Sequence, residues 1–218
     1  MKQTFIRIIA LIAVLLTVTA AHADWRFGLK ASYDNTGATW MIDGEKYTTR
    51  NISGFSAGPS VAYEFIDYFS IESGIYFSMN GFATAEHSFI KGIEYTDEET
   101  VRLYYLQLPI YAVGQYPIKN DITLLLQAGP HFACGLADDV TRHVNFNGLN
   151  YKEEHTESNI AFDKKISRFN VAMHIGIGAE YQGARILVGY DFGLFDSSLI
   201  EDTELRSGGF SVSVGYMF

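Results

Sequence analysis

The last nine residues, FSVSVGYMF at positions 210–218, decide the fold. Apolar or aromatic residues alternate with smaller ones; the first set is Phe210, Val212, Val214, Tyr216 and Phe218, and the second is Ser211, Ser213, Gly215 and Met217. A period of two is that of a β-strand whose two faces meet different surroundings. Ser213 would interrupt the apolar stripe of a helix. The segment therefore predicts a strand with one apolar face.

Seven segments upstream show the same alternation, at residues 25–33, 54–65, 69–79, 104–114, 123–136, 169–181 and 184–194. Each is nine or more residues long, so the chain is expected to contain eight strands. The segment 104–114 is the least regular; its outward residues are predicted to be Leu106, Leu108, Ile110 and Ala112, and its inward residues Tyr105, Gln107, Pro109 and Tyr111.

The connections between these strands alternate in length. The long ones are residues 34–53, 80–103, 137–167 and 195–207, and the short ones are 66–68, 115–121 and 182–183. Short periplasmic turns, long external loops and an even strand number are typical of outer-membrane barrels. Closure leaves no unpaired strand edge in lipid. We therefore predict an all-β fold, an eight-stranded antiparallel up-and-down transmembrane β-barrel. A soluble periplasmic barrel of lipocalin type is the inverted alternative, with its apolar residues inside.

Aromatic residues gather near the predicted strand ends, as in the two interfacial girdles of membrane barrels. The girdle near the short turns is predicted to contain Trp25, Phe65, Tyr68, Phe69, Tyr116, Tyr181 and Phe218, and the girdle near the long loops Tyr33, Phe77, Phe82, Tyr104, Phe169, Phe192 and Phe210.

The first 23 residues have the pattern of a cleaved signal peptide. Lys2 and Arg7 precede an apolar run at 8–18, and Ala21-His22-Ala23 fits a cleavage site. The run is too short for a membrane-spanning helix, and no later stretch has the required length. Residues 24–218 are expected to form a single barrel domain in the outer membrane. Because Asp24 rather than a cysteine would follow the cut, no lipid anchor is expected.

Composition excludes several classes of protein. Charged residues are 19% and aromatic residues 15% of the chain, which excludes a disordered protein. The net charge is −9, and it becomes −11 without Lys2 and Arg7, so nucleic acid is not expected as a partner. Cys134 is the single cysteine and cannot form an intramolecular disulfide; we interpret it as a small apolar strand residue.

Polar residues on the inward faces are expected to meet in the lumen. They are Arg26, Lys30, Glu64, Glu72, Gln107, His131, His174, Glu180, Arg185 and Asp191. Buried charges persist when they are paired and hydrogen-bonded, so we expect a network that fills the interior. The alternative is a narrow conduction path or a small-ligand pocket, although eight strands leave an interior just wide enough for side chains.

No motif for catalysis, a cofactor or a metal ion is evident. His131 and His174 invite comparison with lipid-acting barrel enzymes, but no motif places a nucleophile and a carboxylate beside either one. No cluster has the ligand spacing of a zinc site. Acidic runs in the long connections are expected to be solvated, with cation binding as the alternative; they are 97–99, 138–139, 153–157 and 201–204.

Five segments carry a family resemblance: FGLKASYD at 27–34, SIESGIYFSMNG at 70–81, YLQLPIYA at 105–112, LLQAGPHFACGL at 125–136 and the closing SVSVGYMF. They resemble the PorT-like outer-membrane β-barrel proteins of Bacteroidota, which belong with the small eight-stranded barrels. The terminal Phe218, with Tyr216 two residues before it, resembles the signal that the barrel-assembly machinery recognises. The founder of the family is linked to protein secretion, but no residue pattern here distinguishes such a component from a generic barrel.

The expected function is therefore a non-enzymatic, structural or loop-mediated binding role at the cell surface. The expected partners are outer-membrane lipid, the barrel-assembly machinery and an external ligand or protein at the loops. A narrow channel, a lipid-acting barrel enzyme and a secretion-associated barrel are the alternatives.

Overall fold

The computed structural model describes residues 24–42, 44–90, 93–119, 121–146, 152–158, 160–200 and 202–218. The predicted signal peptide, residues 1–23, lies outside this part of the chain. The barrel strands are β1 (Asp24–Ile42), β3 (Arg50–Ile66), β4 (Phe69–Gly74), β5 (Tyr76–Ile90), β6 (Ile93–Lys119), β7 (Ile122–Phe146), β9 (Phe169–Tyr181), β10 (Ala184–Gly193) and β11 (Thr203–Met217). Two short strands, β2 (Glu45–Thr48) and β8 (Lys152–Ser158), and one helical turn, α2 (Ala161–Lys164), lie among the long connections.

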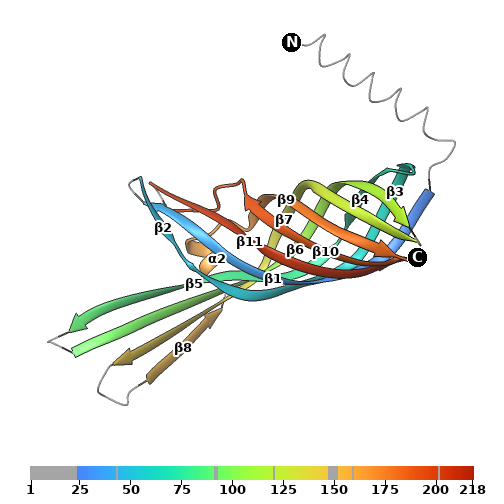
Figure 1. Ribbon diagram of the computed structural model, residues 1–218. Coiled ribbons are helices and arrows are strands. Elements are labelled where there is room, and N and C mark those ends of the chain that lie inside the picture. Colours follow the sequence, from blue (N-terminus) through green and yellow to red (C-terminus); the bar gives the residue numbers. More distant parts are fainter. Residues whose placement is uncertain are drawn as a thin grey trace, which may run out of the picture.

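The strands close into a barrel, as Figure 1 shows. Ala31 of β1 lies opposite Ala57 of β3 on one side and opposite Val214 of β11 on the other. Antiparallel pairings connect the remaining neighbours in the order β11, β10, β9, β7, β6, then β4 with β5, and finally β3. The third predicted strand is divided at Ile75 into β4 and β5. The eight-stranded antiparallel barrel predicted from the sequence is confirmed.

Apolar side chains cover the outside of the barrel. Leu29, Ile177 and Val214 are about 60% exposed, whereas the inward Ala62 and Ser213 are almost fully buried. Water would penalise such an apolar outer band, but the hydrocarbon of a bilayer matches it. The inverted, lipocalin-type arrangement is therefore wrong.

The predicted register of the strand at 104–114 is confirmed. Leu106 and Ile110 face outward and are more than 40% exposed, whereas Tyr105 and Tyr111 are buried inside. Among the described residues, no helix is long and apolar enough to cross a membrane.

Three of the long connections, 34–53, 80–103 and 137–167, are strands rather than loops over most of their length. β5 and β6 remain paired out to Ile90 and Ile93, and β7 pairs with β6 out to Phe146. β8 adds to β7 as a fourth strand. These strands extend past the barrel mouth as one sheet, at the lower left of Figure 1. We call its segments 84–90, 93–102, 138–146 and 152–158 the external sheet.

Residues 160–168 and 195–200 fold across the mouth, and we call them the lid. Ile166 bridges to Ser198, and the Ser167 amide donates to the Ser197 carbonyl at 2.8 Å. Phe162 and Ile166 of the lid pack with Phe82, Leu103 and Leu205 of the barrel strands in a buried apolar cluster.

The placement of Phe82 in an interfacial girdle is wrong, because Phe82 is 5% exposed and belongs to this cluster. Phe77 faces outward, and the strand alternation continues past Met79, so position 82 falls on the inward face. Phe77, Phe192 and Phe210 near the mouth, and Tyr116 and Phe218 at the opposite end, are exposed on the outer surface.

Candidate functional site

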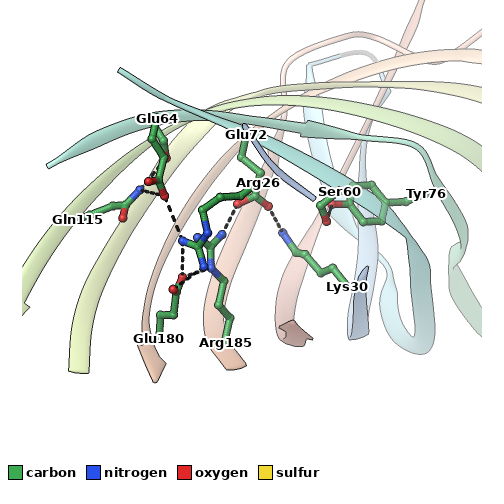
Figure 2. A network of polar contacts seen from close by, with 10 residues as sticks. Arg26, Lys30, Ser60, Glu64, Glu72, Tyr76, Gln115, Glu180 and Arg185 are labelled. Carbon is green, nitrogen blue, oxygen red and sulfur yellow. Dashed lines mark hydrogen bonds and ion pairs between the residues drawn. The ribbon is translucent and has the colours of Figure 1, made fainter. Parts of the chain in front are cut away.

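Charged side chains from opposite walls meet in the half of the lumen near the short turns (Figure 2). Arg185 of β10 donates to Glu72 of β4 at 2.7 Å and to Glu180 of β9 at 2.5 Å. The side chains of Arg185 and Glu72 are only 4% and 6% exposed. Two buried opposite charges thus join strands that lie across the barrel from each other.

Arg26 extends this network toward the end of the barrel at which the short turns lie. Its guanidinium donates to Glu64 at 3.0 Å and to Glu180 at 2.7 Å. Gln115 then donates to Ser70 at 2.9 Å and to Glu64 at 3.4 Å. Gln115 was not predicted as a member of the network, because its strand was expected to end at Gly114.

Lys30 lies above these pairs. Its Nζ is 3.7 Å from Glu72 and lies 5.7 Å and 5.4 Å from the ring centroids of Tyr76 and Tyr111. Each acid of this layer faces at least one base, an arrangement that offsets the cost of burying charge. The side chains that converge here fill this level of the lumen.

A second polar group lies nearer the mouth. Nδ1 of His174 is 2.8 Å from Oδ1 of Asp191, and Nδ1 of His131 is 3.5 Å from the same oxygen. The ring of Tyr111 stacks on His174 at a centroid distance of 4.8 Å. A Cβ at position 189 would come within 2.4 Å of the His174 ring, so this packing requires Gly189.

The two imidazoles thus share one carboxylate rather than flanking a reactive group. Among the described residues, no group of three His, Cys, Asp or Glu side chains is arranged to hold a metal ion. Gln107 lines the cavity of about 90 Å³ between the histidines and the lid. The structure therefore places all ten residues predicted for the lumen inside the barrel.

Asp138 was predicted to be solvated, and this is wrong. It is fully buried, and its carboxylate accepts hydrogen bonds from the backbone amides of Ile160, Ala161 and Phe162 at 2.9–3.1 Å. These three donors begin the α2 turn, so Asp138 fastens the lid to β7.

A bulge explains why Asp138 points inward. Tyr104 pairs with Ala137 and Tyr105 pairs with Gly135, which leaves Leu136 as an extra residue on β7. One extra residue in a strand moves every later side chain of that strand to the other face of the sheet. Extrapolating the alternation of residues 123–136 therefore gives the wrong side for everything from Asp138 onward.

The reversed face continues up the external sheet and lines a cleft of about 930 Å³, which we call the outer cleft. Thr84, Glu99, Arg142 and His155 lie side by side on four consecutive strands. The lid and the β1–β2 hairpin form the other walls. The apolar residues of the cleft include Trp40, Phe82, Val101, Val140, Ile166 and Ile200.

Ion pairs fix the charged wall of the outer cleft. Arg142 pairs with Asp97 through a bidentate contact, and Lys165 of the lid lies 3.8 Å from Glu99. The Arg142 guanidinium lowers the pKa of the Asp97 carboxyl below its usual range. The external sheet and the lid are thus connected by charge as well as by packing.

The sequence model of one protein family, described as the outer membrane protein beta-barrel domain, matches residues 19–199. The chain belongs to this family. The match covers more than four fifths of the chain and agrees with the closed barrel and its apolar outer band. This outer-membrane barrel has no match among curated proteins.

Solved structures that match the chain include outer-membrane and surface proteins. The attachment invasion locus protein Ail of Yersinia pestis is 16% identical, with a TM-score of 0.37 over 88% of this chain and 98% of that one. Neisserial surface protein A is 13% identical, with a TM-score of 0.41 over 90% and 99% of the two chains. OprG of Pseudomonas aeruginosa is 11% identical, with a TM-score of 0.46 over 90% and 95%.

Proposed function

We propose that this outer-membrane barrel is a non-enzymatic surface protein that anchors a rigid binding platform outside the cell. One observation carries the proposal: strands β5, β6 and β7 continue from the wall of the barrel into the external sheet. The external sheet in turn forms one side of the outer cleft. Binding residues are commonly carried on loops that a rigid scaffold positions. Here the scaffold itself continues into the binding region.

The lumen supports the anchoring part of this role. The ion pairs of Arg185, Glu72, Glu180 and Arg26 join opposite walls, and the lid covers the mouth. Such a filled interior stiffens the barrel and favours a structural role for the ten lumen residues over conduction or catalysis.

Export and assembly complete the proposal. Residues 1–23 serve as a cleaved signal peptide, Tyr216 and Phe218 serve as the assembly signal, and the chain is a PorT-like member of its family. Deleting Phe218 is expected to reduce the amount of heat-modifiable protein in the outer membrane, whereas deleting the exposed Asp24 is not. Equal amounts of the two variants would contradict the role of the terminal aromatic residue.

The binding role is tested by shortening the platform while keeping the barrel. In the shortened variant, one Asn-Gly turn replaces the segment between Thr84 and Glu99, and a second replaces the segment between Thr141 and Thr156. Two-residue turns can close these hairpins because the residues of each pair lie opposite each other in the sheet. Outer-membrane vesicles with equal amounts of full-length or shortened protein are passed over immobilised mucin, collagen and lysozyme. We expect the full-length protein to bind at least one of them and the shortened protein to lose that binding. Retention by the shortened protein, or no binding above empty vesicles, would refute the proposal, as would a steady single-channel current in planar bilayers.

A further inference from the structure

We propose that the outer cleft binds an extended, basic polypeptide segment as an added β-strand along the open edge of β5. This inference rests on the proposed function and names the kind of partner that the platform takes.

Two strand edges border the cleft. β5 pairs with β3 only up to Ala83, which lies opposite Arg50, and from Thr84 onward it pairs with β6 alone among the described strands. On the other side of the split, β2 pairs with β1 alone among the same strands. The hairpin of β1 and β2 and the external sheet diverge from this point in Figure 1.

An open edge offers a row of backbone N–H and C=O groups to a further strand. An extended peptide that adds to such an edge gains backbone hydrogen bonds, while its alternate side chains enter the neighbouring pockets. The edge from Thr84 to Glu86 lines the outer cleft, so the added strand would lie inside it rather than on an open surface.

The cleft is apolar near the barrel and charged farther out. Phe82 and Val101 lie at its inner end, whereas Glu86 and Asp97 lie opposite each other two register positions beyond Thr84. Side chains on one face of a bound strand would therefore be apolar at the inner end and basic at the outer end.

The charge of the platform selects a basic partner. Four acidic residues line the outer cleft, Glu86, Asp97, Glu99 and Glu157, and the three basic residues that line it, Arg50, Arg142 and Lys165, each already pair with a carboxylate. Arg142 already pairs with Asp97, whereas Glu86 on the edge strand is exposed and points to the cleft. Complementary charge speeds the encounter and rejects acidic partners.

The test uses the full-length protein in nanodiscs and three labelled nonapeptides. The first alternates lysine with threonine in its outer half and valine with threonine in its inner half. The second has the same side chains with N-methyl groups at alternate backbone nitrogens, and the third has glutamate in place of lysine. Fluorescence anisotropy measures binding, and hydrogen exchange measures protection of the amides at 84–90.

We expect the first peptide to bind and to protect the β5 amides, and the N-methylated and acidic peptides to bind about tenfold more weakly or worse. Glu86→Lys is expected to weaken the first peptide severalfold, whereas Asp67→Lys, an equal charge change at the exposed short turn, is not. Equal binding of the N-methylated peptide, or binding without protection of 84–90, would overturn strand addition. If vesicles still bind immobilised proteins through the platform in that case, strand addition alone fails and the proposed function survives.

Discussion

Replacing Arg185 with methionine is expected to destabilise the barrel strongly. The change keeps a side chain of similar length but removes the buried guanidinium that pairs with Glu72 and Glu180. Among the described residues, Glu72 is then left with only Lys30, at 3.7 Å. Removing one partner of a buried ion pair costs about 3–5 kcal/mol, because the other charge remains buried. The predicted loss is therefore about 3 kcal/mol or more, which is over a hundredfold in the ratio of folded to unfolded protein.

The double variant Glu72→Met/Arg185→Met distinguishes the cost of leaving one buried charge unpaired from the cost of lost packing. Glu180 keeps Arg26 in this variant, and Lys30 keeps its contacts with Tyr76 and Tyr111. We expect the loss of unfolding free energy in the double variant to be smaller than the summed losses of the two single variants by about 2 kcal/mol or more. This difference is the coupling energy of the pair.

The unfolding free energies of the wild type, the two single variants and the double variant are measured by urea unfolding in lipid vesicles. Unfolding is followed by the fraction of protein that keeps the compact gel mobility. The exposed pair Arg206–Glu204, with side chains about half exposed, provides the matched control, and its coupling is expected to stay below about 1 kcal/mol. A coupling at Arg185 no larger than that of the control, or a loss below about 1 kcal/mol for Arg185→Met, would refute the account of the lumen.

Three further outcomes follow from the geometry. Asp138→Asn removes an acceptor of the lid amides, so hydrogen exchange of the lid should become about tenfold to a hundredfold faster; unchanged exchange would contradict the fastening role. Ile175→Arg on the lipid face should cost about 2–4 kcal/mol and reduce assembly, whereas Ile42→Arg, near the outer end of β1, should be tolerated; equal assembly of both would contradict the placement of the membrane band. Arg142→Gln should raise the pKa of Asp97 toward its usual range in NMR titration. Because that pKa is lowered in the folded protein, the contribution of Asp97 to stability is present above its unfolded pKa and is lost as the pH falls through the folded value; an unchanged pKa in the variant would contradict this origin.

The alternating segments predicted the barrel well, because lipid and lumen impose opposite demands on successive residues. In the segment 104–114 the sequence placed Leu106 and Ile110 on the outside and Tyr105 and Tyr111 inside, and the structure agrees. The inward charges could be identified for the same reason, since Arg185 and Glu72 fall on the faces opposite the apolar residues.

The outer half could not be predicted in this way, because its geometry depends on pairing between strands. The extra residue at Leu136 reverses the faces of β7, and nothing in the residue pattern marks it. As a result Asp138 was assigned to solvent, and the face that carries Arg142 was not recognised as a cleft wall. The segments 84–90 and 138–146 also lack a lipid-facing stripe, so their continuation as strands becomes evident only from the cross-strand pairing.

Closure of the barrel between its first and last strands is the central claim, and an engineered disulfide tests it most directly. Ser32 and Ser213 lie opposite each other on β1 and β11 and both face the lumen. The hydrogen bond from the Phe218 amide to the Phe27 carbonyl sets the alternation of the ladder, so Ser32 and Ser213 form a pair without mutual hydrogen bonds, in which the Cα atoms are about 4.5 Å apart. This spacing suits a disulfide.

The measurement uses the variant Ser32→Cys/Ser213→Cys with Cys134→Ser in the outer-membrane fraction. Oxidation should join the two cysteines in the heat-modifiable protein. The loop of about 180 residues between positions 32 and 213 should then change the mobility of the protein in boiled, non-reduced samples. Ser32→Cys with Asp67→Cys, in the exposed short turn between β3 and β4, is the control and should remain reduced. A folded outer-membrane protein whose cysteines at 32 and 213 stay reduced under the same oxidation would contradict a closed barrel.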